Sequence, residues 1–375
     1  FQMSVGIITY HAAYNYGSVL QAYATLYAVE KLGFSAKIVN YRPVEQRKFY
    51  EPMFRTNYGI RTFVKDFQML LYCKDRKVRM ERFEHFIRDQ LELTEEVRFP
   101  DEAEATFMQF DTMISGSDQI LNKHSCELDR VGWEYMDPYL LKGFEGRKVS
   151  YATSIANMSD EELGNIIPEL KKIQHISLRE LSSVGRLASL LGRELTFVAD
   201  PTFLLSAQEW KNALGISEDG KEHILYYSLR SIKIQKERKK ELEALAEKEN
   251  SKIVVITPFS APFSAKKCFE YHYEYGPTDF LNMIVKSKMV VTDSYHGTIL
   301  SVNFGKSVYS ICSNIGSEFR KTDILNYLGL GDRVIHTISE INPQAISPAT
   351  DVIQERIRTL REKSMNYLRS ALVEE

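Results

Sequence analysis

The segment from Thr292 to Thr298 reads Thr-Asp-Ser-Tyr-His-Gly-Thr and brings a carboxylate, hydroxyls and an imidazole together directly after the apolar run Met289–Val291. A histidine titrates near neutrality, so at a turn after a strand it can move a proton to or from a substrate hydroxyl. A lone histidine is more often structural, and that alternative stays open. The pattern makes His296 the candidate catalytic residue.

Two polar loops nearer the N-terminus also follow short apolar runs. The first, His11–Ser18, leads into the start of a predicted helix, where free N–H groups favour anions or sugar hydroxyls. The second, Ser115–Gln119, carries hydroxyl, carboxylate and amide groups beside a glycine, and such groups bind sugars. Each loop also has a structural explanation, because Asn15 and Ser18 can cap the helix and the second loop can be an ordinary turn.

Arg179 is the cation of a further loop, Ser177–Glu180, at the end of another predicted strand. A guanidinium group can hold a carboxylate or a phosphate through two parallel hydrogen bonds. The alternative is a structural ion pair of Arg179 with Glu180 or Asp200. The sequence does not decide between a ligand-binding and a structural arginine.

These loops need parallel sheets to position them, because the carboxyl ends of parallel strands meet at one edge. Short β-branched runs alternate with helix-length amphipathic segments, which predicts two parallel α/β domains. The predicted strands are residues 5–10, 36–41, 110–115, 149–152, 175–178 and 197–198, then 224–229, 253–257, 289–292 and 307–310. The predicted helices include residues 18–32, 160–172, 180–191, 233–249, 278–287 and 296–304.

The length of 375 residues suits two hydrophobic cores better than one. We expect an N-terminal Rossmann-like domain over residues 3–210, with a helical insertion at about 44–96 whose periodicity runs through Phe63, Phe67, Leu70 and Leu71. A second Rossmann-like domain is expected over residues 211–345. Residues 346–375 are expected to form a C-terminal amphipathic helix that covers another surface.

The composition argues against several classes of function. A formal net charge of −2 gives no electrostatic case for a nucleic-acid partner, and the basic run Lys233–Lys240, with glutamates at helical spacing, predicts a solvated helix face. The four cysteines are scattered, so neither a zinc site nor a disulfide framework is expected. No apolar run approaches the ~20 residues of a membrane span, and the first residues lack a signal-peptide pattern. We therefore expect a cytoplasmic protein.

Short motifs follow one another in a characteristic order along the chain. They are Gly6–Tyr10, Asn15–Tyr23, Phe110–Asp111, Gly116–Gln119, Ser150–Ser154, Ser177–Glu180, Asp200–Thr202, Gly276–Pro277 and Asp293–Thr298. Together they resemble the polysaccharide pyruvyl transferase family over about residues 6–331. Each motif is short, but their shared order over this length makes coincidence an unsatisfactory explanation.

The resemblance implies a glycosyltransferase-B-like architecture, in which two Rossmann-like domains face each other across a cleft and a C-terminal helix returns toward the first domain. It also implies transfer of a pyruvyl group from phosphoenolpyruvate to two hydroxyls of a sugar, giving a cyclic ketal and phosphate in surface polysaccharide biosynthesis. The implied acceptor is a carbohydrate or a lipid-linked oligosaccharide, compatible with a peripheral position at the inner membrane face. Phosphoenolpyruvate is a substrate here, and neither a metal nor a cofactor is expected.

The resemblance also implies roles for individual residues, beginning with proton transfer by His296. The implied donor-binding residues are Arg179, Ser294, Tyr295, Gly297, Thr298 and Arg320, and the implied acceptor-binding residues are Asn15, Tyr16, Gly17, Ser117, Asp118 and Gln119. Many members of the family have Arg-Leu-His where this chain has Ser294-Tyr295-His296, so an expected cation is missing, and Arg320 or Lys321 are candidates to replace it. Two other functions stay open: a glycosyltransferase that uses a nucleotide-activated sugar, and a non-catalytic glycan-binding relative.

Overall fold

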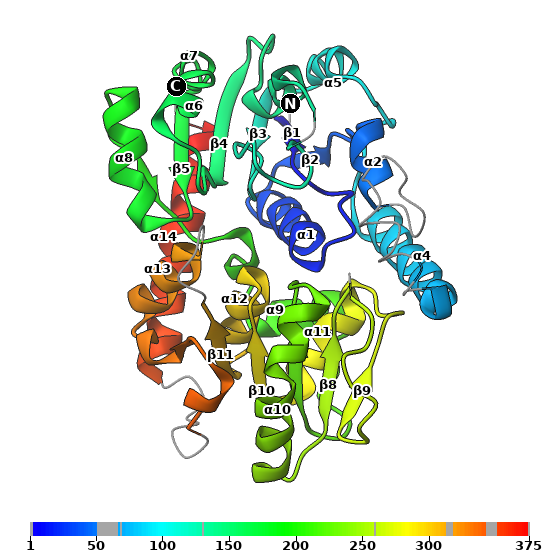
Figure 1. Ribbon diagram of the computed structural model, residues 1–375. Coiled ribbons are helices and arrows are strands. Elements are labelled where there is room, and N and C mark those ends of the chain that lie inside the picture. The colour runs from blue at the N-terminus through cyan, green and yellow to red at the C-terminus, as the bar shows by residue number, and fades with distance from the viewer. Residues whose placement is uncertain are drawn as a thin grey trace. The chain divides into compact units, whose positions relative to one another are not determined.

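The computed structural model describes residues 3–50, 67, 70–129, 131–258, 260–312, 318–342 and 351–373. The chain divides into two compact units, whose elements are labelled in Figure 1. The first unit consists of Phe1–Tyr50, Glu84–Leu205 and Arg358–Glu375, and the second of Glu51–Phe83 and Ser206–Ile357.

Within the described part of the first unit, six parallel strands form a sheet in the order β2-β1-β3-β4-β5-β6 (Figure 1). The strands are β1 (Ser4–Ile8), β2 (Ser35–Ile38), β3 (Thr112–Ser115), β4 (Arg147–Thr153), β5 (His175–Leu178) and β6 (Thr196–Phe197). β3 and β4 are buried almost throughout, as expected for central strands of a parallel sheet. The strand order reverses between β1 and β3, which is where open α/β sheets bind their ligands.

The helices of the first unit follow local signals in the sequence. They are α1 (Tyr16–Lys31), α2 (Val44–Tyr50), α5 (Pro100–Phe107), α6 (Asp160–Gly164), α7 (Ile167–Leu170) and α8 (Leu181–Leu191), with the 3-10 helices η3 (Trp133–Leu140) and η4 (Pro201–Phe203). The single helix predicted over residues 160–172 is wrong, because the chain forms α6 and α7 instead. Pro168 lies in the first turn of α7, where its ring prevents a continuous helix.

The described second unit has a parallel sheet of six strands in the order β12-β11-β10-β7-β8-β9. The strands are β7 (His223–Tyr227), β8 (Ile253–Ile256), β9 (Phe269–Tyr271), β10 (Ser287–Thr292), β11 (Ser307–Ile311) and β12 (Val334–Ile335). Counted within the unit, this is the 3-2-1-4-5-6 order of dinucleotide-binding folds, and its order reverses between β7 and β10. The predicted α/β fold with parallel sheets is therefore confirmed, while the edge strands β9 and β12 were not predicted.

The helices of the second unit are α9 (Ala207–Leu214), α10 (Ile232–Lys248), α11 (Pro277–Lys286), α12 (Tyr295–Asn303) and α13 (Phe319–Leu328), with the 3-10 helices η2 (Leu70–Tyr72), η5 (Gly331–Arg333) and η6 (Ile338–Glu340). In each unit, apolar side chains of the strands and of neighbouring helices form a buried hydrophobic core cluster. Ile8, Met113 and Leu178 lie in the first core, and Ile224 and Val291 in the second.

α4 (Cys73–Gln90) is the longest described part of the helical insertion predicted at about 44–96. The predicted periodicity around Phe63 lies outside the described residues. The rings of Tyr72 and Tyr273 are 4.6 Å apart, and Arg82 Nη1 lies 2.8 Å from Asp279 Oδ2. These contacts hold Tyr72 and the first half of α4 within the second unit.

α14 (Asp351–Val373) is the predicted C-terminal helix, and from Arg358 onward it belongs to the first unit. The backbone N of Ala199 donates a hydrogen bond to Ser364 Oγ at 2.8 Å, and Arg361 Nε donates to the carbonyl oxygen of Phe203 at 2.6 Å. The units differ from the domain ranges expected from the sequence. The boundary between them lies at residues 205/206 and not at 210/211, and residues 51–83 belong to the second unit. Residues of α14 belong to both units.

Candidate functional site

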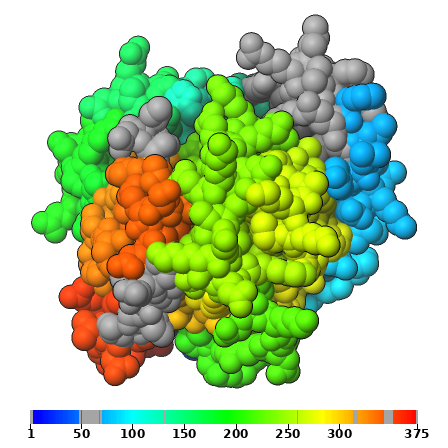
Figure 2. Space-filling model, turned by 60° about the horizontal axis from the view of Figure 1, so that its bottom comes forward, coloured from blue at the N-terminus to red at the C-terminus, as the bar shows by residue number. Residues whose placement is uncertain are grey.

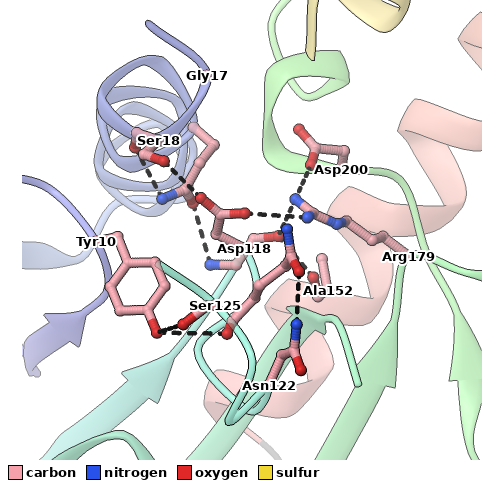
Figure 3. A network of polar contacts seen from close by, with 12 residues as sticks. Tyr10, Gly17, Ser18, Asp118, Asn122, Ser125, Ala152, Arg179 and Asp200 are labelled. Carbon is pink, nitrogen blue, oxygen red and sulfur yellow. Dashed lines mark hydrogen bonds and ion pairs between the residues drawn. The ribbon is translucent and has the colours of Figure 1, made fainter. Parts of the chain in front are cut away.

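Buried polar side chains from several loops meet at the carboxyl edge of the first sheet (Figure 3). Ser18, in the first turn of α1, donates a hydrogen bond to Asp118 Oδ2 at 2.7 Å. Arg179 Nη2 lies 3.1 Å from Asp118 Oδ1, and Arg179 Nη1 lies 2.7 Å from Asp200 Oδ2. Residues that the sequence placed in separate loops after β1, β3 and β5 therefore form one network.

Arg179 is a buried cation shared by two carboxylates. Its side chain is 0% exposed, and those of Asp118 and Asp200 are 9% and 0% exposed. The Thr202 backbone N and hydroxyl both donate to Asp200 Oδ1, at 3.0 and 2.7 Å, and so fix that carboxylate. The structural ion pair with Asp200 is thus present, and donor binding by Arg179 stays a prediction.

Ser117 and Gln119 form hydrogen bonds that shape the loop after β3. Ser117 is buried; its Oγ donates to the carbonyl oxygen of Ala152 at 2.6 Å, and its backbone N donates to Gln21 Oε1 at 3.1 Å. Gln119 is half-buried, and its Oε1 accepts from Asn122 Nδ2 at 2.7 Å. Of the two, Gln119 is the one that retains partial access to solvent.

The predicted residues Asn15, Tyr16 and Gly17 form the start of α1. Asn15 is the N-cap, and its Oδ1 accepts a hydrogen bond from the backbone N of Gly17 at 3.0 Å. Tyr16 is buried, whereas Asn15 is half-buried. The capping alternative is therefore confirmed for Asn15, whereas Ser18 instead donates to Asp118. Contact of Asn15, Tyr16 and Gly17 with an acceptor stays a prediction.

His11 begins a polar chain that was not predicted. Its Nε2 lies 3.0 Å from Asn40 Oδ1, which also accepts from Arg42 Nε at 2.9 Å. Arg42 Nη1 in turn lies 2.8 Å from Glu84 Oε1, and the Tyr14 hydroxyl donates to the same oxygen at 2.5 Å. Burial, assisted by the charge of Arg42, lowers the pKa of His11 to about 4, so its imidazole is neutral at pH 7.

In the second unit, Asp293 joins the ends of β7 and β10, where the strand order reverses. Its Oδ2 accepts from Ser228 Oγ and from Arg238 Nη1, both at 2.6 Å. Its Oδ1 accepts from the backbone N of Leu229 at 2.9 Å. Asp293 therefore fixes the loops on which the predicted catalytic segment is built.

Arg238 corrects the expectation that the whole basic run 233–240 is a solvated helix face. Figure 2 shows α10 at the molecular surface in yellow-green. The lysines of the basic run that are exposed on this helix are Lys233, Lys236 and Lys240. Arg238 turns inward to Asp293, and its side chain is only 14% exposed. A buried carboxylate needs a cationic partner, and this requirement outweighs solvation of the guanidinium.

His296 lies in the first turn of α12. Ser294 is the N-cap of this helix, and its Oγ accepts from the backbone N of Gly297 at 3.2 Å. His296 is 8% exposed, and its ring packs edge-on against Tyr295 with centroids 5.2 Å apart. The segment thus holds the imidazole in a defined position at the carboxyl edge of the second sheet.

Gly297 and Thr298 determine how closely α12 approaches the sheet. A Cβ on Gly297 would lie 2.8 Å from both Thr292 Oγ1 and Tyr227 Cδ1, so no side chain fits there. Thr298 is fully buried, and its Oγ1 hydrogen-bonds the Ser294 carbonyl oxygen and Ser310 Oγ, both at 2.9 Å. These contacts give both residues a structural role in placing His296.

The lysine and the arginine proposed to replace the missing cation differ in environment. Lys321 is 3% exposed and donates to the carbonyl oxygens of Asp293, at 3.0 Å, and Ile311, at 2.6 Å. Burial lowers the pKa of this lysine. Arg320 is half-buried and lies 5.7 Å from the ring centroid of Tyr295. Arg320 is consequently the more accessible cation of the two.

Arg230 is a further cation at this edge that the sequence reasoning missed. It follows β7, and its backbone N donates to Ser228 Oγ at 3.2 Å, which links it to the hydrogen bonds of Asp293. Its side chain is 37% exposed and pairs with Glu318. The sequence signal that could have identified Arg230 is its position three residues after β7, the strand that borders the order reversal.

The sequence profile of the family described as polysaccharide pyruvyl transferase matches residues 15–313. The chain belongs to the polysaccharide pyruvyl transferase family. The range matched by this pyruvyl transferase profile includes Asn15, the Asp118–Arg179 network and His296. No curated protein sequence matches the chain.

Solved structures with a similar fold cover nearly the whole pyruvyl transferase chain. One is a putative UDP-N-acetylglucosamine 2-epimerase from Listeria monocytogenes, at 11% identity, covering 100% of this chain and 98% of that one with a TM-score of 0.56. A UDP-GlcNAc 2-epimerase from Methanocaldococcus jannaschii (10%, 98% and 93%, TM-score 0.51) and Arabidopsis thaliana UGT89C1 complexed with UDP-L-rhamnose (10%, 98% and 94%, TM-score 0.51) are also similar. These likenesses confirm the glycosyltransferase-B-like fold and carry no information on substrates.

Among the residues that the structure describes, no helix combines the length and the apolar character needed to cross a membrane.

Proposed function

We propose that this member of the polysaccharide pyruvyl transferase family moves a pyruvyl group from phosphoenolpyruvate to two hydroxyls of a sugar, forming a cyclic ketal during surface polysaccharide biosynthesis. The observation that carries the proposal is the position of His296. It lies within the family match, in the first turn of α12, directly after the strand that borders the order reversal of the second sheet. Open α/β sheets bind their ligands at such a reversal.

The proposed reaction requires both a proton donor and a proton acceptor. Protonation of the methylene carbon of phosphoenolpyruvate makes the adjacent carbon electrophilic, and a sugar hydroxyl that attacks this carbon loses its proton. An imidazole can act in either direction near neutral pH. The Ser294 cap fixes the turn that carries His296, and the edge contact with the Tyr295 ring packs one side of the imidazole, which supports His296 in this role.

The donor carries a carboxylate and a phosphate, so the proposal also requires cations. Arg320 and Arg230 are both partly accessible at the edge of the second sheet, and we assign them to the donor anion. The start of α12 adds the favourable end of a helix dipole. Ser294, Tyr295, Gly297 and Thr298 then shape the donor site, and buried Arg179 acts by positioning the loop of Asp118.

On the acceptor side, the half-buried Asn15 and Gln119 are proposed to meet the sugar. Tyr16, Gly17, Ser117 and Asp118 are buried or internally bonded, and support those two residues from behind. The proposed acceptor is a carbohydrate or a lipid-linked oligosaccharide, which suits a cytoplasmic protein peripheral to the inner membrane face. The proposed chemistry requires neither a metal nor an organic cofactor.

The test is turnover of phosphoenolpyruvate by the purified protein with a panel of glycosides, measured as phosphate release and as the ketal methyl signal in proton NMR. His296→Ala should lower kcat by about 10²-fold or more, in the range of lost general acid–base catalysis. His85→Ala, at an exposed position on α4, is the matched control and should retain activity. No phosphate release by the wild-type protein across a broad panel would contradict the proposal.

A glycosyltransferase that uses a nucleotide-activated sugar is the alternative, favoured by Ser294 at the place of the expected arginine. Thermal-shift screening separates the donors, because a ligand at 100 times its Kd stabilises the folded state by about 2.7 kcal/mol. Stabilisation by a UDP-sugar together with indifference to phosphoenolpyruvate would favour this alternative. Unchanged polysaccharide synthesis in cells that carry His296→Ala would instead favour a non-catalytic glycan-binding protein.

A further inference from the structure

Glu127 is a carboxylic acid in the loop that follows β3, the same loop that carries residues 117–119. This loop is fixed from within. Lys123 Nζ donates to the carbonyl oxygen of Leu128 and, at 2.8 Å, to that of Val131. The side chain of Leu128 is buried in the first core. Glu127 is therefore presented from a rigid turn, as a group that transfers protons must be.

Tyr50 connects Glu127 to the loop after β1. The Tyr50 hydroxyl donates a hydrogen bond to Glu127 Oε1 at 2.5 Å. The ring of Tyr50 contacts that of Tyr14, with centroids 5.8 Å apart, and Tyr14 directly precedes Asn15. Glu127 itself is half-buried and keeps partial access to solvent. Its carboxyl group is thus tied to both loops that we assign to the acceptor.

The surroundings of Glu127 disfavour its charged form. Burial is the largest cause, and together with the charge of Asp118 it raises the pKa of Glu127 to about 7, although the hydrogen bond from Tyr50 opposes this rise. Besides Asp118, the titratable groups that interact with Glu127 include Tyr10, Tyr50, Tyr139 and Cys126. Burial is the largest cause that raises the pKa of each of the three tyrosines, and the charge of Glu127 adds to it, so they are neutral near pH 7.

We infer that Glu127 accepts the proton of the attacking sugar hydroxyl and that Tyr50 positions its carboxylate for this step. The inference rests on the proposed function. In the step, the hydroxyl O–H bond breaks, its proton passes to Glu127, and its oxygen bonds the carbon made electrophilic by protonation of the donor methylene. The bond from that carbon to the phosphate oxygen then breaks with its electron pair on the phosphate, which takes up the proton directly or through solvent. The second hydroxyl adds to the same carbon and passes its proton to Glu127. This proton returns through solvent to the acid that protonated the donor methylene, so the two hydroxyl protons balance those taken up by the methyl carbon and the phosphate.

The experiment compares Glu127→Gln and Tyr50→Phe with the wild-type protein in the phosphoenolpyruvate assay, using p-nitrophenyl galactosides, glucosides, mannosides and N-acetylglucosaminides as acceptors. Glu127→Gln should lower kcat by about 10²-fold or more and leave KM for phosphoenolpyruvate unchanged. It should also remove the ionisation near pH 7 from the acidic limb of the pH profile. Tyr50→Phe should lower kcat less than Glu127→Gln does, and it should shift the acidic limb of the pH profile. Asp129→Asn removes an exposed carboxylate from the same loop and should change neither quantity.

The outcomes separate this inference from the proposed function. Wild-type turnover combined with an unchanged kcat in Glu127→Gln overturns the inference and leaves the proposed function standing. No phosphate release by the wild-type protein overturns both. If Glu127→Gln does not fold, Glu127→Asp replaces it and should lower kcat while retaining an acidic limb. Carbon NMR of labelled glutamate gives an independent readout, since titration of Glu127 near the ordinary value of about 4.3 would overturn the inference.

Discussion

Replacing Arg179 by Met tests whether this arginine holds the first unit together or binds a substrate. Met retains much of the apolar volume of the side chain and removes the charge that Asp118 and Asp200 share, at 3.1 and 2.7 Å. Breaking a buried ion pair from one side costs about 3–5 kcal/mol. Because two nearly inaccessible carboxylates lose their cation at once, we expect the upper end of this range. A loss of that size is a large part of the roughly 5–15 kcal/mol that stabilises a typical domain.

The assay is urea unfolding followed by circular dichroism, with hydrogen exchange of β4 and β5 to localise the effect in the first unit. A second variant that combines Arg179→Met with Asp118→Asn and Asp200→Asn should recover most of the lost stability, because no uncompensated charge stays buried. If Arg179→Met unfolds at the same urea concentration as the wild-type protein but no longer turns over phosphoenolpyruvate, the structural role of Arg179 is refuted and donor binding is favoured.

Further predictions concern both units. Gly297→Ala should lower the free energy of unfolding by about 1–3 kcal/mol through overpacking, whereas Gly164→Ala, where no atom lies within 4 Å of the added Cβ, should be neutral or slightly stabilising in the same urea experiment. Asp293→Asn should cost about 2–4 kcal/mol, because it weakens the buried pair with Arg238, and pairing the substitution with Arg238→Met should restore part of the loss in a double-mutant cycle. For His11, the folded-state pKa of about 4 lies below the ordinary 6.5, so its stabilising contribution is fully present above pH 6.5 and is lost as the pH falls toward 4. His11→Gln should remove about 3 kcal/mol of that acid sensitivity, seen as a flatter dependence of the urea midpoint on pH, and an unchanged dependence would contradict the burial argument.

The regular elements were predictable where a long periodic pattern met a clear end signal. α10 and α11 agree with the predicted helices within one residue at each end, and β5 agrees completely. β9 and β12 were missed because their three and two residues carry little hydrophobic alternation, although the equally short β6 was predicted with its position shifted by one residue. Pro168 was the local signal that the prediction of one helix over residues 160–172 ignored.

The candidate site was predictable as a set of loops but not as a set of contacts. The sequence placed Asp118, Arg179 and His296 after strands, and the structure has them there. It could not show that Arg238 leaves the solvated face of its helix, because the cause is Asp293, 55 positions further along the chain. Glu127 was missed for the same reason, since its partner Tyr50 is 77 positions away.

In both sheets, the aspartate at the order reversal has the same two kinds of partner. Asp118 accepts from Ser18 and pairs with Arg179, and Asp293 accepts from Ser228 and pairs with Arg238. In both cases the carboxylate, which the sequence places in the loop after a predicted strand, is already occupied by a serine and an arginine of its own unit. Such an aspartate serves as a fixed support for its loop.

This division of roles leads to different expectations for substitutions. Residues that keep partial access to solvent at these edges are the ones available to a substrate, among them Asn15 and Gln119 in the first unit and Arg230 in the second. Changes at Gln119 and Arg230 should alter substrate affinity with little effect on unfolding, whereas removal of the Asn15 cap should also lower stability by about 0.5–2 kcal/mol. Changes at the aspartates and their arginines should lower stability first, and activity only as a consequence, because the loops they support lose their geometry.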